Sequence, residues 1–125
     1  TNCGGPCPLM SAQMQEFQGE FQHDADISLL SFSVDPDNDT PGVLRAYAQR
    51  FGAISGKWKF LTGQKSTIHD LTINGFHLAL KDDPDAITHS TKFVLIDKET
   101  TIRGYYDSED QDSMKKLIED ARSVR

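Results

Sequence analysis

Helical and strand-like patterns alternate along the first half of this chain, and that alternation limits the folds it can adopt. Apolar residues recur with helical spacing at Met10, Met14, Phe17 and Phe21, which predicts a helix with one apolar face. A short apolar run follows over residues 27–35, and its length and polar flanks predict a buried strand. Strands that alternate with helices are typical of parallel β-α-β units, so we expect an α/β protein.

The pattern then repeats. Thr40 is a suitable N-cap, Pro41 fits the first helical position and Gly52 ends the predicted helix. The apolar face of this helix consists of Leu44, Tyr47, Ala48 and Phe51. Residues 58–62 predict a strand, and Ser66 is expected to cap a short helix that ends near residue 75.

The second half closes with a predicted hairpin and helix. Residues 76–81 are a candidate strand, and a polar loop follows over residues 81–91. Residues 92–97 and 101–107 predict two antiparallel strands joined by a short turn, which makes the sheet mixed. The last helix is expected from about Asp110, and its apolar face consists of Met114, Leu117, Ile118 and Ala121.

Length and charge narrow the class of protein. The 125 residues suit one domain over residues 1–125, and 37% hydrophobic with 26% charged residues is typical of a globular domain. The net charge of −6 argues against nucleic acid as a partner. No apolar run approaches the ~18 residues of a membrane span. The chain starts at Thr1, so we expect a processed or truncated end with an anchor upstream.

Two cysteines, Cys3 and Cys7, flank three residues at the start of the chain and are its only cysteines. Pro8 is expected at the first helical position, which places Cys7 at the helix N-terminus. The positive end of a helix favours ionisation of a thiol, and the thiolate is both the nucleophile and the metal ligand. Gly4 and Gly5 allow a tight turn, so we expect the loop to present two sulfur atoms at one place.

Three interpretations of the cysteine pair remain open: a structural disulfide, a redox couple and a metal site. A disulfide across so short a loop would constrain the unfolded chain only slightly. Thioredoxin-like proteins also carry a cysteine pair at the start of a helix, but with two intervening residues. The wider spacing here closes more easily around a metal ion.

Four stretches of the chain resemble the Sco/SenC family, in order and over nearly its whole length: TNCGGPCP, SFSVDPDNDTPGVLRAYAQRF, WKFLTG and THSTKFVLID. The shared pattern is a CxxxCP motif, an SVDPxxDTP segment and a histidine just before a strand. The family consists of thioredoxin-fold copper-binding proteins that serve assembly of the copper centre of cytochrome c oxidase. The resemblance therefore implies a thioredoxin-like α/β/α fold of three layers with a mixed sheet.

The resemblance implies a copper site formed by Cys3, Cys7 and His89. Soft thiolates favour Cu(I), and imidazole suits both Cu(I) and Cu(II). Three ligands leave the site open, so that it can release copper to a partner. The chain departs from the family at Thr88, where an aspartate is common, so a charged partner of the imidazole is lost. The insert Gly4-Gly5-Pro6 is also unlike the usual one.

The implied fold places the candidate ligands together. Cys7, Asp35 and His89 would meet at one edge of the sheet, where α/β proteins commonly keep their sites. This fold also needs a strand directly before the cysteine loop, but only Thr1 and Asn2 precede Cys3. We therefore expect that strand to lie in a longer native chain.

Other polar and sulfur-containing residues are weaker candidates. We expect none of the other histidines to be a ligand: His23 lies at a helix end, His69 at the surface of a short helix, and His77 in the candidate strand with no cysteine or carboxylate nearby in sequence. Asp35 is expected in the turn before Pro36, with a place near copper as the alternative. Asp37 and Asp39 are expected to have loop and capping roles. Core packing is expected of Met10, Met14, Phe32, Trp58 and Phe60. An acidic loop is expected at Asp82, Asp83 and Asp85, and it could face a basic partner.

The resemblance favours a copper metallochaperone that serves a copper-bearing subunit of cytochrome c oxidase. It implies a domain on the periplasmic or intermembrane-space side of a membrane, anchored by an upstream segment. The alternative is a thiol–disulfide oxidoreductase in which Cys3 and Cys7 are the redox-active, catalytic pair. A third interpretation is a zinc site that adds Asp35 to the three ligands. Copper binding requires His89, whereas thiol exchange does not.

Overall fold

The computed structural model describes residues 6–77 and 92–124, with side chains from residue 8 onward. The elements are α1 (Pro6–Glu20), β1 (Leu29–Phe32), α2 (Pro41–Arg50), β2 (Trp58–Leu61), α3 (Lys65–Asp70), η1 (Leu71–Gly75), β3 (Lys92–Ile96), β4 (Ile102–Asp107) and α5 (Gln111–Val124). They belong to two compact units, one within Thr1–Ser90 and one within Thr91–Arg125.

Helix α1 begins at Pro6, two residues before the expected start at Pro8. Both prolines lie in the first turn, where backbone N–H groups have no acceptor within the helix, so neither residue costs a hydrogen bond. Cys7 is therefore the second residue of α1, and its predicted place at a helix N-terminus is confirmed. Met14 and Phe17 pack against the core of the first unit, as expected.

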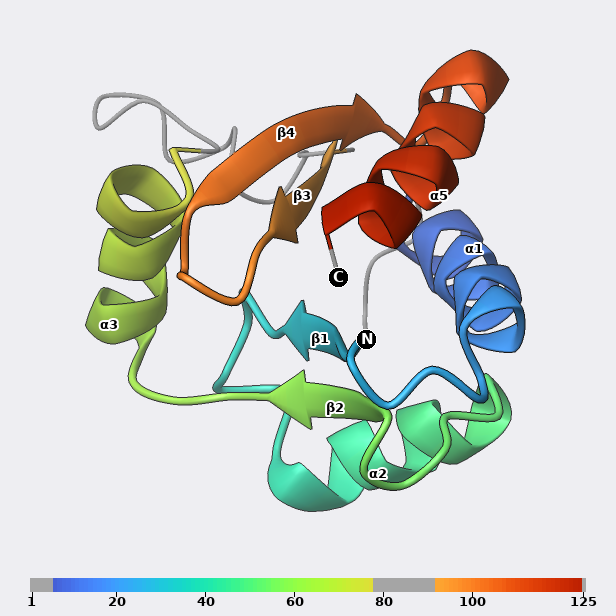
Figure 1. The fold of residues 1–125 in the computed structure, drawn as a ribbon. Helices are drawn as coiled ribbons and strands as arrows, with labels where there is room; N and C mark the ends of the chain where they lie inside the picture. Colours follow the sequence, from blue (N-terminus) through green and yellow to red (C-terminus); the bar gives the residue numbers. More distant parts are fainter. Residues whose placement is uncertain (1–5, 78–91, 125) are drawn as a thin grey trace. The chain divides into compact units, whose positions relative to one another are not determined.

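Strands β1 and β2 pair in parallel, with Leu29 opposite Trp58 and Phe32 opposite Leu61. Helix α2 connects the two strands (Figure 1), so this part of the chain forms the predicted β-α-β unit. Strand β1 is shorter than the apolar run over residues 27–35, since its paired residues are Leu29–Phe32.

The ends of α2 follow the predicted signals. The Thr40 side chain accepts a hydrogen bond from the backbone N–H of Val43 at 3.3 Å, and Pro41 occupies the first turn. Gly52 follows the helix with a φ of 69°, which is a left-handed conformation that glycine adopts without strain. The predicted N-cap and helix stop are therefore confirmed.

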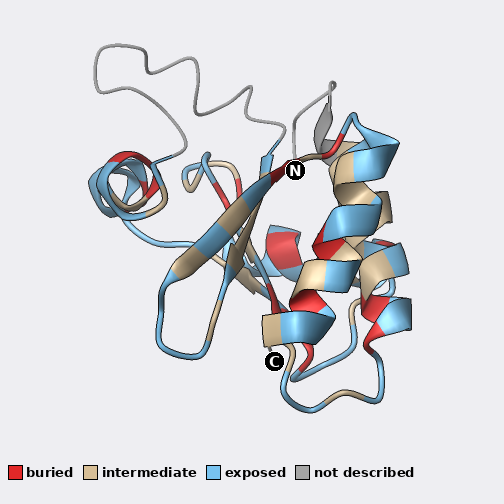
Figure 2. Ribbon diagram, turned by 45° about the horizontal axis from the view of Figure 1, so that its top comes forward, coloured by how far each residue is buried: buried red, intermediate tan, exposed pale blue. Residues whose placement is uncertain are grey.

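The core of the first unit consists of Leu29, Phe51 and Trp58, all of them buried. Further partly buried residues pack against it: Ala12, Met14, Phe17, Ile27, Tyr47, Ala53 and Phe60. The ring centroids of Trp58 and Phe60 are 4.9 Å apart. The predicted core positions of Trp58 and Phe60 are confirmed, and Figure 2 shows how buried and exposed residues alternate along the helices.

The predicted core position of Phe32 is wrong. Phe32 is 38% exposed and Leu30 is 49% exposed, whereas Leu29 is buried. Successive side chains of a strand point to opposite faces, so Leu30 and Phe32 lie on the face of β1 opposite to the core. The Phe32 ring instead lies beside the ring of Phe76, with centroids 5.7 Å apart.

Polar side chains link α1 to α2 and to the segment that follows α2. The buried Gln18 donates from Nε2 to the carbonyl oxygen of Gly52 at 3.0 Å and accepts from the backbone N–H of Ile54 at 2.8 Å. The hydroxyl oxygens of Ser11 and Tyr47 lie 2.9 Å apart and share a hydrogen bond. These bonds fix α1, the helix that carries Cys7, on the β-α-β unit.

Helix α3 begins at Lys65, after Gln64, which forms no side-chain cap. The predicted cap at Ser66 is therefore wrong, because Ser66 already lies within the helix. The helical segment continues through η1 to Gly75, where its end was expected. Of the predicted strand over residues 76–81, only Phe76 and His77 lie within the described residues. The rest of that segment and the loop after it lie outside them.

The second unit contains the predicted hairpin and closing helix. Strands β3 and β4 pair antiparallel, with Phe93 opposite Tyr106. In the turn between them, Asp97 accepts the backbone N–H groups of Thr101 at 2.9 Å and Glu99 at 3.0 Å. The bond from Thr101, together with Arg103 at 3.2 Å, lowers the pKa of the Asp97 carboxyl.

The buried side chain of Tyr106 links the hairpin to helix α5 by a hydrogen bond. Leu117 and Ala121 are buried on the predicted apolar face. Tyr106 of β4 donates to the Asp120 carboxylate of α5 at 2.6 Å, and Asp120 also pairs with Lys116 at 3.3 Å. Burial and then this hydrogen bond raise the pKa of Tyr106 to about 12.

We expect Tyr106→Phe to change how stability depends on alkaline pH. Folding favours the neutral phenol, since the pKa of Tyr106 is about 12 in the folded protein against an ordinary value of 10.0. Its contribution is complete below pH 10.0 and is lost as the pH rises to about 12. The wild-type free energy of unfolding should thus fall more steeply over this range than that of the variant. Urea denaturation at each pH measures the free energy of unfolding, and Tyr105→Phe is the exposed control. An equal dependence on pH in the wild type and in Tyr106→Phe would contradict the raised pKa of Tyr106.

Candidate metal centre

Of the three predicted ligands, only Cys7 lies in the described part of the chain, and there only its backbone is described. It occupies the first turn of α1. Helix N-termini carry partial positive charge, which favours a thiolate over a thiol. Cys3 and His89 lie outside the described residues, as does Thr88. The predicted ligand set therefore stays a prediction.

The rival histidines lie at the surface, as was expected of His23 and His69. His23 is exposed in the turn after α1, and His69 is exposed on α3. His77 is exposed after η1 and has a φ of 55°. Within residues 6–77 and 92–124, no three histidine, cysteine or acidic side chains are grouped closely enough to hold a metal ion.

The loop between β1 and α2 carries the SVDPxxDTP segment and is anchored by a buried carboxylate. Asp39 is only 3% exposed. Its Oδ2 accepts the hydroxyl of Ser33 at 2.7 Å, and its Oδ1 accepts the side-chain amide of Asn38 at 3.1 Å. The hydroxyl of Ser33 also accepts the backbone N–H of Asp35 at 3.1 Å. One buried pair of side chains therefore determines the path of the whole loop.

Asp35 has the turn role that was expected of it. Its carbonyl oxygen accepts the N–H groups of Asn38 at 3.2 Å and Asp39 at 2.9 Å, and its side chain is exposed. A place for Asp35 near bound copper, and with it the zinc alternative, stays a prediction. Asp37 is exposed in the same turn, as a loop residue should be.

The buried role of Asp39 was missed in the sequence, where it was expected to be an ordinary loop or capping residue. The available signal was its position between the strand-ending Ser33 and the helix cap Thr40. A short loop that joins a buried strand to a packed helix must satisfy its polar groups internally. Asp39 supplies the acceptor for that purpose.

No helix in the described residues combines the length and the apolar character that a membrane crossing requires.

Sequence comparison relates the whole chain to one family. A family model described as SCO1/SenC matches residues 1–124. The SCO1 protein homolog of Bacillus subtilis (strain 168) is 30% identical over 128 residues, which include 99% of this chain and 66% of the relative. The chain therefore spans just under two thirds of the length of that relative.

Solved structures confirm the predicted thioredoxin-like α/β fold. A SCO1/SenC family lipoprotein from Bacillus anthracis str. Ames matches with a TM-score of 0.83 and 29% identity, over 98% of this chain and 75% of that one. BsSco, a member of the Sco family of cytochrome c oxidase assembly proteins in which a disulfide switch was identified, matches with a TM-score of 0.82 and 30% identity, over 99% and 74%. Copper-bound ScoI from Bradyrhizobium japonicum shares the fold at 18% identity, with a TM-score of 0.70 over 98% and 78%.

We expect Ser33→Ala to destabilise the loop that follows β1. The change removes the donor 2.7 Å from the buried Asp39 carboxylate, and a hydrogen bond to a charged group contributes about 1.5–3 kcal/mol. Thermal and urea unfolding measure the loss. Ser66→Ala, an exposed change of the same type on α3, is the control. Equal stability of the two variants would show that the buried pair does not hold the loop.

Proposed function

This chain belongs to the SCO1/SenC family, and on that premise we propose that it binds copper through Cys3, Cys7 and His89. We further propose that it serves, as one domain over residues 1–125, the assembly of the copper centre of cytochrome c oxidase. Copper is then the cargo, taken up and passed on rather than used in a reaction. The observation that carries the proposal is the match over residues 1–124 to the family model together with the family's cysteine motif at the start of α1.

The chemistry of the donor set fits this cargo. Two thiolates and one imidazole are soft and borderline ligands, which favour copper over calcium or magnesium. A helix N-terminus at Cys7 supports the thiolate form that a metal ligand must have. Both cysteines must be deprotonated and His89 neutral to bind, so affinity should fall as the pH is lowered.

The proposed setting follows from the relatives. BsSco is described as belonging to a family of cytochrome c oxidase assembly proteins, and the Bacillus anthracis relative is described as a lipoprotein. We infer for this chain a copper-bearing subunit of the oxidase as partner. We also infer a position on the outer side of a membrane, held there by an anchor upstream.

A second candidate function is thiol–disulfide exchange by Cys3 and Cys7. The disulfide switch identified in BsSco, at 30% identity, favours it. In that reaction the two thiols form an Sγ–Sγ bond and transfer two electrons and two protons to a disulfide of the partner, which is reduced to two thiols. This function requires both cysteines but not His89.

We expect the reduced protein to bind one copper ion per chain in an anaerobic titration with Cu(I). His89→Ala should weaken binding by about tenfold or more. Loss of a residue that only supports a metal ligand typically lowers metal affinity about 10–100-fold, and loss of a ligand should lower it at least as much. His69→Ala, an exposed change of the same type on α3, should bind like the wild type. X-ray absorption should show two sulfur ligands and one nitrogen ligand, with the nitrogen lost in His89→Ala.

The same titration separates the two functions. Wild type that binds no copper, or His89→Ala that binds as tightly as wild type, would contradict the proposed site. Reduction of a model disulfide by such a protein, abolished in Cys3→Ser and Cys7→Ser, would then establish the exchange reaction instead.

A further inference from the structure

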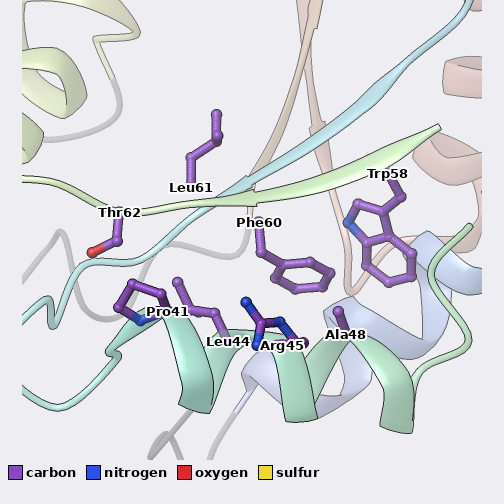
Figure 3. A pocket seen from close by; sticks show the side chains of 8 residues that line it. All are labelled: Pro41, Leu44, Arg45, Ala48, Trp58, Phe60, Leu61 and Thr62. Carbon is purple, nitrogen blue, oxygen red and sulfur yellow. The ribbon is translucent and has the colours of Figure 1, made fainter. Parts of the chain in front are cut away.

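A groove between α2 and β2 in the first unit has no role in the proposed copper site. Its space is about 370 Å³. The floor is apolar and is formed by Leu44 and Ala48 of α2 and by Trp58 and Phe60 of β2. In Figure 3 the rings of Trp58 and Phe60 extend from β2 toward α2, while Leu61 points to the other side of the strand.

The groove is lined by β2, whose two edges differ in their pairing. The inner edge of this strand pairs with β1, since the carbonyl oxygens of Lys57 and Leu61 accept the N–H groups of Leu29 and Ser33, each at 2.8 Å. Backbone groups alternate in direction along a strand, so the N–H and C=O of Phe60 point to the outer edge. Among residues 6–77 and 92–124, no strand pairs with that edge.

The charged side chain that lines the groove is positive, although the chain carries a net charge of −6. Arg45 lines the groove from α2, and α2 contains no acidic residue. Within the described residues the Arg45 side chain forms no ion pair or hydrogen bond. An arginine beside an apolar floor is suited to a carboxylate carried next to an apolar group.

We propose that this groove binds an extended segment of a partner protein, which adds as a strand to the outer edge of β2. One apolar side chain of the segment enters the space over Phe60 and Ala48, and an acidic side chain two residues away, on the same face of the added strand, pairs with Arg45. The outer backbone edge of β2 supplies hydrogen bonds to the segment, as in other strand-addition complexes. The apolar floor favours an apolar side chain, and Arg45 favours an acidic one. The proposal is independent of copper binding.

The probe for this site is a capped, fluorescently labelled peptide of about six residues, the typical length of a strand. It alternates threonine and valine and contains one phenylalanine and, two residues later, one glutamate, because side chains two residues apart point to the same face of a strand. We expect saturable binding at one site, measured by fluorescence anisotropy, that weakens as salt is added. Arg45→Ala should weaken it about tenfold, because it removes a charge-assisted hydrogen bond. Arg50→Ala, on the same helix but outside the groove, should not.

Three further measurements separate strand addition from other contacts. A peptide methylated on its backbone nitrogens should lose binding, because it cannot donate to the edge of β2. Ala48→Phe, checked for folding by circular dichroism, should exclude the anchor side chain and lose binding too. Glutamine in place of the peptide's glutamate should weaken binding to wild type about tenfold and to Arg45→Ala hardly at all.

Several results would overturn the proposal. They are the absence of saturable binding to wild type, binding that Arg45→Ala leaves unchanged, and full binding of the methylated peptide. Sedimentation that shows a dimer of this chain, dissociated by Arg45→Ala, would also overturn it, because the groove would then be occupied by a second copy of the chain.

Discussion

The parallel pairing of β1 with β2 is the constraint on which the first unit depends. Leu29 lies opposite Trp58, and both side chains point to the face that α1 and α2 cover. A shift of the register by one residue would turn Lys59 toward that face and remove Trp58 from the core. The positions of both helices, and thus of Cys7 at the start of α1, depend on this one register.

The same register explains why the loop after β1 needs a buried carboxylate. Ser33 continues the pairing by donating its N–H to the carbonyl of Leu61, so its hydroxyl is carried into the interior. Asp39 accepts that hydroxyl and places the chain for the N-cap at Thr40. Helix α2 is therefore held by an anchored loop at its start and by aromatic packing against β2.

Elements whose signals are local could be predicted well from the sequence. The caps of α2, the β3–β4 hairpin and the apolar face of α5 depend on nearby residues and formed where they were expected. Errors arose where tertiary contacts decide the outcome. An apolar run does not reveal which face of a strand is covered, so Phe32 was misplaced, and a loop aspartate such as Asp39 does not reveal its burial. The predicted ligand set rests on motifs shared with a family. The spacing of Cys3, Cys7 and His89 along the chain does not determine the distances between them in the folded protein.

The prolines on both sides of Cys7 influence the cost of any bond that its sulfur forms. A helix usually starts with four unpaired N–H groups, but Pro6 and Pro8 have none, so the first turn of α1 offers only those of Cys7 and Leu9. Their rings also fix the backbone φ angle before and after Cys7. Little backbone freedom remains to be lost at this position when a disulfide or a metal bond forms. The proposed bonds of Cys7 would therefore start from a backbone position that α1 already fixes.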